Sequence, residues 1–441
     1  MWLLPLVRPF ARTAIGLFYR FEVAGERPAA TGPLLVVANH PNMAADAGAV
    51  IAALPRPVRF LAKAPLFANP VVGAVLRGVG AIPVYRRRDD PGSVERNQET
   101  FEAAGDALAT GAAVAVFPEG ISHGEPALAP LRTGAARIAL ATAERTGGAF
   151  PIVAVGLTYR DKTRFRSRAL ALVGGAVEWD DLASPPADAK AVRELTKRID
   201  RALRRVTVNL ETWEDAPAVE AAEAIYAAAL GLPRDAESRA TRLRDIARML
   251  ERLRETDEAA VEPLERAVVS FDAFLRRLGL RPATLDIATR VSVAVRWVAG
   301  RVLPFAIVAP FLLVGLVLFF VPYRLTDLLA ARGAGPEVRA SLKILGGCAV
   351  YIAWFVVLAV AAGIAFGAAA GLGVFVLLPA VGTATLAAAQ WWDRTRREAK
   401  TFLLLRSRES LRQRLLARRA ELASELERLR ASFEASRQPG H

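Results

Sequence analysis

The most constraining feature of this chain is a segment, residues 344–392, that contains no charged side chain. A helix of about 20 apolar residues can cross a bilayer, so the segment has room for two spans. We expect them at about 344–368 and 373–392, with the chain turning at Gly371-Leu372-Gly373. A chain that carries this segment cannot be a single water-soluble globule.

A second apolar segment, 302–321, has Pro310 near its middle. Cations lie between the two apolar segments and again after the second one: Arg324, Arg332, Arg339, Lys343, Arg394, Arg396, Arg397 and Lys400. Positive flanks face the cytosol. Both sets can do so only if 344–392 is a hairpin and 302–321 enters the bilayer and returns. The sequence therefore predicts a multi-pass inner-membrane protein with two spans, one re-entrant segment and cytosolic termini.

Lysine and arginine number 58 against 44 acidic residues, which gives a formal charge of +14. The mean hydropathy is +0.27 although 23% of the residues are charged, as expected when membrane segments are joined to soluble parts. The positive charge favours anionic partners such as phosphate groups or acidic lipid. No basic, aromatic-studded motif or recognition helix is evident, so nucleic acid is not an expected partner. The single cysteine, Cys348, lies in apolar sequence and is no candidate nucleophile.

Short apolar runs alternate with helical patterns between residues 34 and 177. The expected strands are 34–38, 58–62, 82–84, 113–117, 152–158 and 170–177. The expected helices are 43–54, 70–79, 94–109 and 134–145. Strands separated by helices indicate an α/β sheet, with the functional groups where the strands end.

These patterns divide the chain into regions. Residues 1–30 are expected to form an amphipathic helix that lies in the lipid headgroup layer or packs on its own domain. An α/β domain covers 31–215, a helical region with a core-packing role covers 216–300, and the membrane region covers 301–392. Residues 393–441 form a basic amphipathic helix, for which a short coiled coil and a helix on anionic lipid are both open.

The residues with the clearest chemical meaning follow the first strand. Asn42 is a good N-cap for the helix 43–54, so His40 lies at a strand-to-helix corner with Asp46 one turn into the helix. A carboxylate there can hold one imidazole nitrogen while the other faces a cleft, which is how a general base is built. The alternative is a capping histidine and a first-turn aspartate favoured by the helix dipole.

Candidate anion-binding groups stand at the ends of other predicted elements. Lys63 and Arg86 each follow a strand, where an arginine can bind a phosphate through two parallel hydrogen bonds. Glu119 and Gly120 lie in a tight turn whose glycine lets backbone N–H groups approach a ligand. Arg132 stands just before a helix, and helix starts favour anions.

The pentapeptide Gly120-Ile121-Ser122-His123-Gly124 matches the G-x-S-x-G pattern of serine hydrolases. That pattern needs a helix directly after the serine, which Pro126 blocks, and a triad histidine further along the chain. The later histidines are His123, which is the next residue, and His441, which is the last. A serine hydrolase is therefore not expected.

Four blocks of sequence, taken together and in this order, resemble the glycerophospholipid acyltransferases of the lysophosphatidic acid and glycerol-3-phosphate acyltransferase type. The blocks are Asn39-His40 with Asp46, Ile82-Pro83-Val84-Tyr85-Arg86, Phe117-Pro118-Glu119-Gly120 with Ser122, and Phe150-Pro151-Ile152-Val153-Ala154-Val155-Gly156. The commonest family pattern has four residues between the histidine and the aspartate. This chain has five, an HX5D spacing that resembles a subset including fungal-type glycerol-3-phosphate acyltransferases.

The resemblance implies a membrane-bound acyltransferase with a mixed sheet flanked by helices, followed by a helical region and C-terminal membrane helices. His40 would take the proton of an acceptor hydroxyl that attacks an acyl thioester, and Asp46 would fix the histidine tautomer. Substrate-binding residues are expected at three family positions and at two sites chosen from charge and placement: Arg86, Glu119, Gly120, Lys63 and Arg132.

The resemblance also sets the expected partners. The donor would be acyl-CoA or an acylated carrier protein, and the acceptor would be glycerol phosphate or a lysolipid, with membrane lipid around the protein. No metal or other cofactor is expected, since three histidines leave no room for a histidine-rich metal site. Two alternatives stay open: an acyltransferase of the same fold acting on another lysolipid or an amino-lipid, and a non-catalytic membrane protein with an inactive domain.

Overall fold

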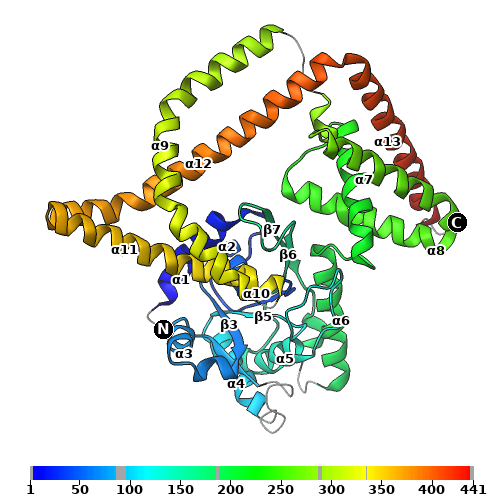
Figure 1. The fold of residues 1–441 in the computed structure, drawn as a ribbon. Coiled ribbons are helices and arrows are strands. Elements are labelled where there is room, and N and C mark those ends of the chain that lie inside the picture. Colours follow the sequence, from blue (N-terminus) through cyan, green and yellow to red (C-terminus); the bar gives the residue numbers. More distant parts are fainter. Residues whose placement is uncertain (1–2, 86–95, 185–187, 287–290, 334, 438–441) are drawn as a thin grey trace. The chain divides into compact units, whose positions relative to one another are not determined.

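The structure is a computed structural model that describes residues 3–85, 96–184, 188–286, 291–333 and 335–437. The chain divides into two compact units, each with its own hydrophobic core (Figure 1). The first unit consists of Met1–Asn209 and Ala330–Leu345, and the second consists of Leu210–Leu329 and Gly346–His441.

The first unit is built around a seven-stranded mixed sheet with the order β1-β7-β6-β2-β5-β3-β4. The strands are β1 (Arg20–Gly25), β2 (Leu34–Ala38), β3 (Val58–Lys63), β4 (Ile82–Val84), β5 (Ala113–Val116), β6 (Ile152–Tyr159) and β7 (Arg168–Ala176). Neighbouring strands are parallel except β6 and β7, which pair antiparallel. The six strands expected from the sequence are confirmed, and β1 is an additional strand.

Helices flank this sheet. They are α1 (Leu4–Phe18), α2 (Ala44–Ala53), α3 (Pro70–Gly78), α4 (Asn97–Ala109), α5 (Gly134–Thr146), α6 (Ala189–Val206) and α10 (Pro336–Ser341), with short 3₁₀ turns η1 (Ala64–Ala68) and η3 (Asp180–Leu182). All of β2 is buried, which explains its continuous apolar sequence. Val50 and Leu54 pack with this strand in the core. The mixed sheet flanked by helices is the fold class expected from the sequence.

The amino-terminal helix is shorter than the predicted region 1–30. α1 ends at Phe18, and β1 then pairs with β7 at the edge of the sheet. Polar and apolar side chains alternate along Arg20–Gly25, which is a strand pattern rather than a helical one. Ile15 and Phe18 are buried, so α1 packs on its own domain through one face.

The second unit contains a bundle formed by α7 (Ala216–Ala229), α8 (Ala236–Arg277) and α13 (Glu409–Arg437), with short turns η4 (Trp213–Asp215) and η5 (Pro282–Thr284). Its core joins Ile225 of α7 and Leu275 of α8 to the heptad-spaced Leu415 and Leu422 of α13. The apolar stripe of the tail is therefore used within the chain. This packing replaces both the coiled coil and the lipid-bound helix considered for residues 393–441, because neighbouring helices of the same chain cover such a stripe equally well.

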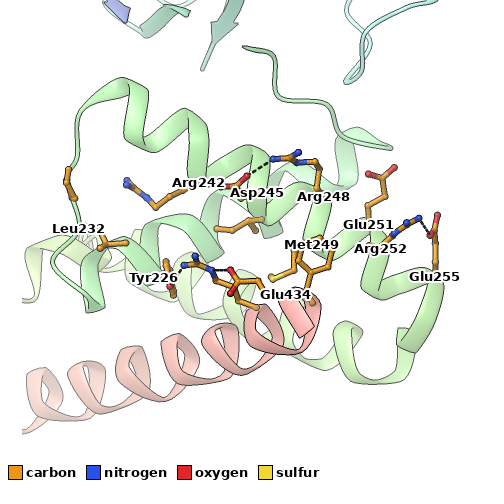
Figure 2. A pocket seen from close by; sticks show the side chains of 14 residues that line it. Tyr226, Leu232, Arg242, Asp245, Arg248, Met249, Glu251, Arg252, Glu255 and Glu434 are labelled. Atoms are coloured by element: carbon orange, nitrogen blue, oxygen red, sulfur yellow. Dashed lines mark hydrogen bonds and ion pairs between the residues drawn. The ribbon is translucent and has the colours of Figure 1, made fainter. Parts of the chain in front are cut away.

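A pocket of about 700 Å³ lies within this bundle, lined by residues of α7, α8 and α13 (Figure 2). Figure 2 shows its charged side chains facing one another: Arg248 lies 2.6 Å from Asp245, and Arg430 lies 2.9 Å from Glu434. Arg430 also donates to the Tyr226 hydroxyl at 3.0 Å. All four lining arginines have acidic partners, so the pocket offers no unpaired cation to an anionic ligand.

Three helices among the described residues are long and apolar enough to cross a membrane: Leu312–Ala331, Val338–Phe366 and Ala368–Ser407. They belong to α9 (Val291–Ala331), α11 (Gly347–Phe366) and α12 (Ala368–Ser407), and η6 (Leu342–Gly346) leads into α11. α9 runs without a break through 302–321, so the re-entrant turn expected at Pro310 is not present. A proline inside a helix removes one hydrogen bond and kinks the axis, but it does not by itself reverse the chain.

The turn between the last two apolar helices lies earlier than predicted. The chain turns at Gly367, where φ is +94°, and not at Gly371-Leu372-Gly373. Gly371 lies inside α12, where an added Cβ would be 2.7 Å from the carbonyl oxygen of Ala359 in α11. This glycine therefore serves close helix packing, which is common between membrane helices, and not the turn.

The contact between β6 and α6 gives a test of the first unit. An added Cβ at Gly156 would overlap the carbonyl oxygen of Val206, the last residue of α6. We expect Gly156→Ala to lower the free energy of unfolding by about 1–3 kcal/mol, because the backbone must move. At Gly148 an added Cβ meets nothing within 4 Å, so Gly148→Ala is the control. Equal thermal midpoints of the two variants in detergent would contradict this packing.

Candidate active site

The carboxyl ends of neighbouring parallel strands meet at one edge of the sheet. β2 is parallel to β5 on one side and to β6 on the other, and β3 continues the parallel series beyond β5. His40 follows β2, residues 117–120 follow β5, and Lys63 ends β3. The sheet thus brings together stretches that are far apart in the sequence, at the edge where α/β proteins place their functional groups.

His40 and Asp46 form a hydrogen-bonded pair at this edge. The imidazole Nδ1 lies 2.9 Å from Asp46 Oδ2, and the same oxygen accepts the backbone N–H of Asn42 at 2.6 Å. Asp46 is fully buried, whereas 19% of the His40 side chain is exposed. An ionised Asp46 holds a proton on Nδ1, so the lone pair is on Nε2 and is available to a substrate hydroxyl.

Opposing influences act on the pKa of Asp46. Burial raises the pKa of the Asp46 carboxyl, while the hydrogen bonds from His40 and Asn42 act in the opposite direction. Burial, and then the charge of Asp46, also raise the pKa of the Tyr159 phenol, which stays neutral. In the described part of the chain, Asp46 Oδ1 and Asn42 Oδ1 accept no hydrogen bond. The donors His40 Nδ1–H and Asn42 N–H thus share one carboxylate oxygen.

The turn that leads into α2 has an unusual backbone conformation. Met43 has φ +47° and ψ −124°, which residues other than glycine rarely adopt, and its N–H donates to the Ser122 hydroxyl at 3.0 Å. Asn42 does not cap α2 as expected, because Met43 occupies the N-cap position. The buried Asn42 amide donates instead to the Tyr19 hydroxyl at 2.9 Å.

Two neighbours fix the position of His40. The ring of Phe117 stacks on the imidazole, with centroids 4.0 Å apart and planes 8° from parallel. The Asn39 side chain donates to the carbonyl oxygen of Leu157 at 3.0 Å and accepts the N–H of the same residue at 2.7 Å. This pair of bonds ties the end of β2 to β6. His40 is therefore held in place by the protein itself.

Glu119 supports His40 from the backbone side. The glutamate is buried, and its Oε1 accepts the His40 N–H at 2.8 Å. Its Oε2 accepts the Ala129 N–H at 2.8 Å and contacts His123 Nε2. Both carboxylate oxygens are thus engaged by groups of the protein itself. The geometry gives Glu119 a positioning role, and its contact with a substrate stays a prediction.

His123 is a site residue that the sequence interpretation did not assign. Its Nδ1 accepts the Glu125 N–H at 3.2 Å, so its proton is on Nε2, which donates to Glu119. Its own backbone N–H donates to the carbonyl oxygen of His40 at 3.2 Å. The sequence signal for this role is that His123 stands four residues after Glu119, in a segment that forms no helix. Within the described ranges, no group of three or more His, Cys, Asp or Glu side chains is arranged to hold a metal ion.

The predicted anion-binding residues have different outcomes. Gly120 adopts φ +73°, and an added Cβ there would lie 3.4 Å from Cγ of Arg132, so the Arg132 side chain lies beside this turn. The Arg132 N–H donates to the Pro118 carbonyl oxygen at 2.7 Å, and its side chain is exposed. Lys63 is exposed at the end of β3, two strands from β2. Arg86 lies outside the described residues.

Part of this chain is similar to known proteins. Residues 20–158 match the family model Acyltransferase. Glycerol-3-phosphate O-acyltransferase 2 of Saccharomyces cerevisiae is 26% identical over 274 residues, which cover 60% of this chain and 36% of the yeast protein. Glycerol-3-phosphate O-acyltransferase 1 of the same organism is 31% identical over 125 residues, which cover 27% of this chain and 16% of the yeast protein. The chain thus spans little more than a third of the length of the first relative.

A solved structure is also similar to this chain. It is the crystal structure of the 1-acyl-sn-glycerophosphate (LPA) acyltransferase PlsC from Thermotoga maritima, with 19% sequence identity and a TM-score of 0.35. The match covers 46% of this chain and 78% of that one.

The sheet brings a paired histidine and aspartate to its carboxyl edge. Residues 20–158 form a domain of the acyltransferase family, and the predicted resemblance to the glycerophospholipid acyltransferases is confirmed.

The substitution Asp46→Asn separates function from stability. We expect acyl transfer to fall by about 10²–10⁴, because a neutral amide no longer stabilises the imidazolium. Since burial raises the pKa of Asp46, the folded state loses stability as the pH rises through that pKa and the carboxyl ionises. Asparagine carries no charge, so burial no longer penalises this side chain and the thermal midpoint should stay equal or rise. A clear loss of thermal stability would contradict this account.

A second substitution, Glu119→Gln, tests the positioning role. Glutamine has one carbonyl oxygen, so it cannot accept from both His40 and Ala129. We expect kcat to fall about tenfold, the worth of one such hydrogen bond, with the KM for the phosphate acceptor unchanged. The control is Glu125→Gln, whose side chain is exposed. A raised KM with unchanged kcat would instead support direct substrate binding.

Proposed function

We propose that this protein is a membrane-bound O-acyltransferase that moves a fatty acyl group from a thioester donor to the hydroxyl of glycerol-3-phosphate or 1-acylglycerol-3-phosphate. The observation that carries the proposal is the buried Asp46 carboxylate, 2.9 Å from Nδ1 of the partly exposed His40. The printed names of the two yeast relatives, both glycerol-3-phosphate O-acyltransferases, support the acceptor class.

In the proposed reaction, His40 Nε2 takes the proton of the acceptor hydroxyl while the hydroxyl oxygen attacks the thioester carbonyl carbon. Asp46 stabilises the imidazolium that forms and keeps its ring oriented. The tetrahedral intermediate then collapses, the carbon–sulfur bond breaks, and the imidazolium returns the proton to the departing thiolate. The products are an ester and a free thiol, and the bonds balance without a further co-reactant.

The acceptor phosphate requires cations close to this pair. Arg132 lies beside the turn at Gly120. This turn directly follows Glu119, which accepts the His40 backbone N–H. Lys63 stands at the same edge of the sheet. We assign the phosphate to these two cations and to Arg86, with an arginine fork as its strongest ligand. The donor would be acyl-CoA or an acylated carrier protein.

The proposed location is the inner membrane, with the active site on the cytosolic side. The apolar helices support it: Ile364 and Phe366 of α11 are 84% and 82% exposed, which suits contact with lipid. The closely packed pair α11 and α12 would cross the bilayer twice, with its positive flanks in the cytosol. In this proposal α9 does not cross, although it is long enough, because α7 and α8 before it pack with α13 after the pair. Residues Ala330–Leu345, which carry one of these flanks, belong to the first unit, where α10 packs on α2. That flank therefore lies on the side of the active site.

The test is a radiolabelled acyl transfer assay on the purified full chain, with glycerol-3-phosphate, lysophosphatidate, other lysolipids and an amino-lipid offered side by side. We expect transfer to one of the first two acceptors. His40→Ala should lower the rate by at least about 10², the lower end of general-base contributions. His441→Ala is the matched histidine control.

Three results would change the assignment. Full transfer by His40→Ala would refute the mechanism. Transfer to another lysolipid or an amino-lipid alone would replace the acceptor. If neither acyl-CoA nor acylated carrier protein supported transfer to any acceptor, the domain would be catalytically inactive.

A further inference from the structure

The hairpin segment 160–168, which is the connection between β6 and β7 with the first residue of β7, carries more cations than the proposed reaction uses. Its basic residues are Arg160, Lys162, Arg164, Arg166 and Arg168, against one acid, Asp161. Three of them, Arg160, Arg164 and Arg168, are exposed and have no side-chain hydrogen bond or ion pair in the described part of the chain. An exposed group of unpaired cations is a site of attraction for anions.

This hairpin is held firmly against the end of α1. Asp161 Oδ1 accepts the Arg164 N–H at 3.1 Å, which orders the turn. The Arg166 N–H donates to the Phe18 carbonyl oxygen at 2.6 Å, and its guanidinium donates to the Gly16 carbonyl oxygen at 2.7 Å. Arg166 therefore binds the carboxyl-terminal carbonyls of α1. The hairpin that carries Arg160, Arg164 and Arg168 is therefore fixed to the end of α1.

Apolar side chains are exposed on the hairpin and along α1, whose end the hairpin contacts. Phe165 is 40% exposed, and its ring packs on Phe18 with centroids 5.7 Å apart. Leu6, Phe10 and Leu17 recur on one face of α1 and are 61%, 49% and 42% exposed. Cations next to an outward aromatic and aliphatic stripe form the kind of surface that enters a lipid headgroup layer.

We propose that residues 160–168 and the outward face of α1 form a docking surface for a bilayer of anionic phospholipid. Lipid is favoured over a soluble anion because a soluble anion would use the cations alone and leave the apolar stripe in water. β6, which leads into the hairpin, is the direct parallel neighbour of β2, which leads into His40. The surface would therefore hold the active-site edge at the lipid. The inference rests on the membrane location in the proposed function and adds how the domain is oriented there.

The experiment uses the full chain in vesicles of phosphatidylcholine alone or mixed with phosphatidylglycerol. Cys348→Ala and Phe165→Cys leave a single thiol, which carries an environment-sensitive fluorophore. A second protein carries the label at Lys190→Cys, an exposed position on α6. We expect the emission of the first label to move to shorter wavelength in anionic vesicles only, and that of the second label to stay unchanged. Added salt should reverse the shift.

Charge variants identify the residues responsible. In the combined variant Arg160→Gln, Arg164→Gln and Arg168→Gln, the docking equilibrium should fall by about fivefold for each arginine removed. The control removes three exposed and unpaired cations of α6 with the substitutions Arg193→Gln, Lys197→Gln and Arg205→Gln. It should keep the full shift. Equal thermal midpoints of both triple variants would establish that folding is intact.

Specific results would overturn the proposal. One is that the emission of the label at Phe165→Cys does not respond to phosphatidylglycerol. Another is that this emission shift survives in the hairpin variant, which combines Arg160→Gln, Arg164→Gln and Arg168→Gln. A hairpin variant with an unchanged shift and a higher KM for acyl-CoA or acyl carrier protein would assign the cations to the donor. Acyl transfer is measured in the same vesicles. Loss of the shift with transfer retained refutes the docking surface alone, whereas a shift without transfer refutes only the proposed activity.

Discussion

The active site depends on one buried carboxylate in contact with an imidazole. Removing Asp46 from water disfavours its charge, whereas two donors, His40 Nδ1–H and the Asn42 N–H, point at the same oxygen and favour it. Each donor is held in turn by another residue. The His40 backbone is bound by Glu119, and the Asn42 amide is bound to Tyr19. The edge of the sheet thus supplies hydrogen-bond donors that favour a charge which burial disfavours.

Glu119 is a second buried acid that acts on the same histidine from the opposite side. Asp46 fixes the ring of His40, while Glu119 fixes its backbone. The two acids come from segments that only the parallel order of β2 and β5 brings together. His123 completes this support because its Nε2–H faces the other oxygen of Glu119. Ring and backbone of the base are thus fixed independently, which reduces the reorganisation needed when a substrate binds.

The sheet and the pairing of His40 with Asp46 could be predicted because both depend on local pattern. A buried strand needs a continuous apolar run, and a corner residue followed by an acid one turn into a helix must lie near it. The role of Asn42 could not be predicted, because its partner Tyr19 is distant in the sequence and its side chain leaves the cap position. His123 was missed for the same reason, since its value comes from contacts across the sheet edge.

The membrane region shows a similar limit. Composition identifies apolar helices well, but a glycine in such a run has more than one use. Gly367 makes the turn, whereas Gly371 makes the helix contact, and only the three-dimensional packing distinguishes them. Pro310 was also ambiguous, because a proline is compatible with a kinked helix as well as with a reversal. Residues with several allowed roles are therefore where sequence interpretation failed.

The turn between His40 and Asp46 contains a strained residue, Met43. Its positive φ costs about 1–3 kcal/mol in a residue other than glycine. The Met43 N–H donates to the Ser122 hydroxyl, so this conformation is anchored by the segment that follows β5. The contact between His40 and Asp46 therefore depends on a turn whose strain is held by a residue 79 positions further along the chain.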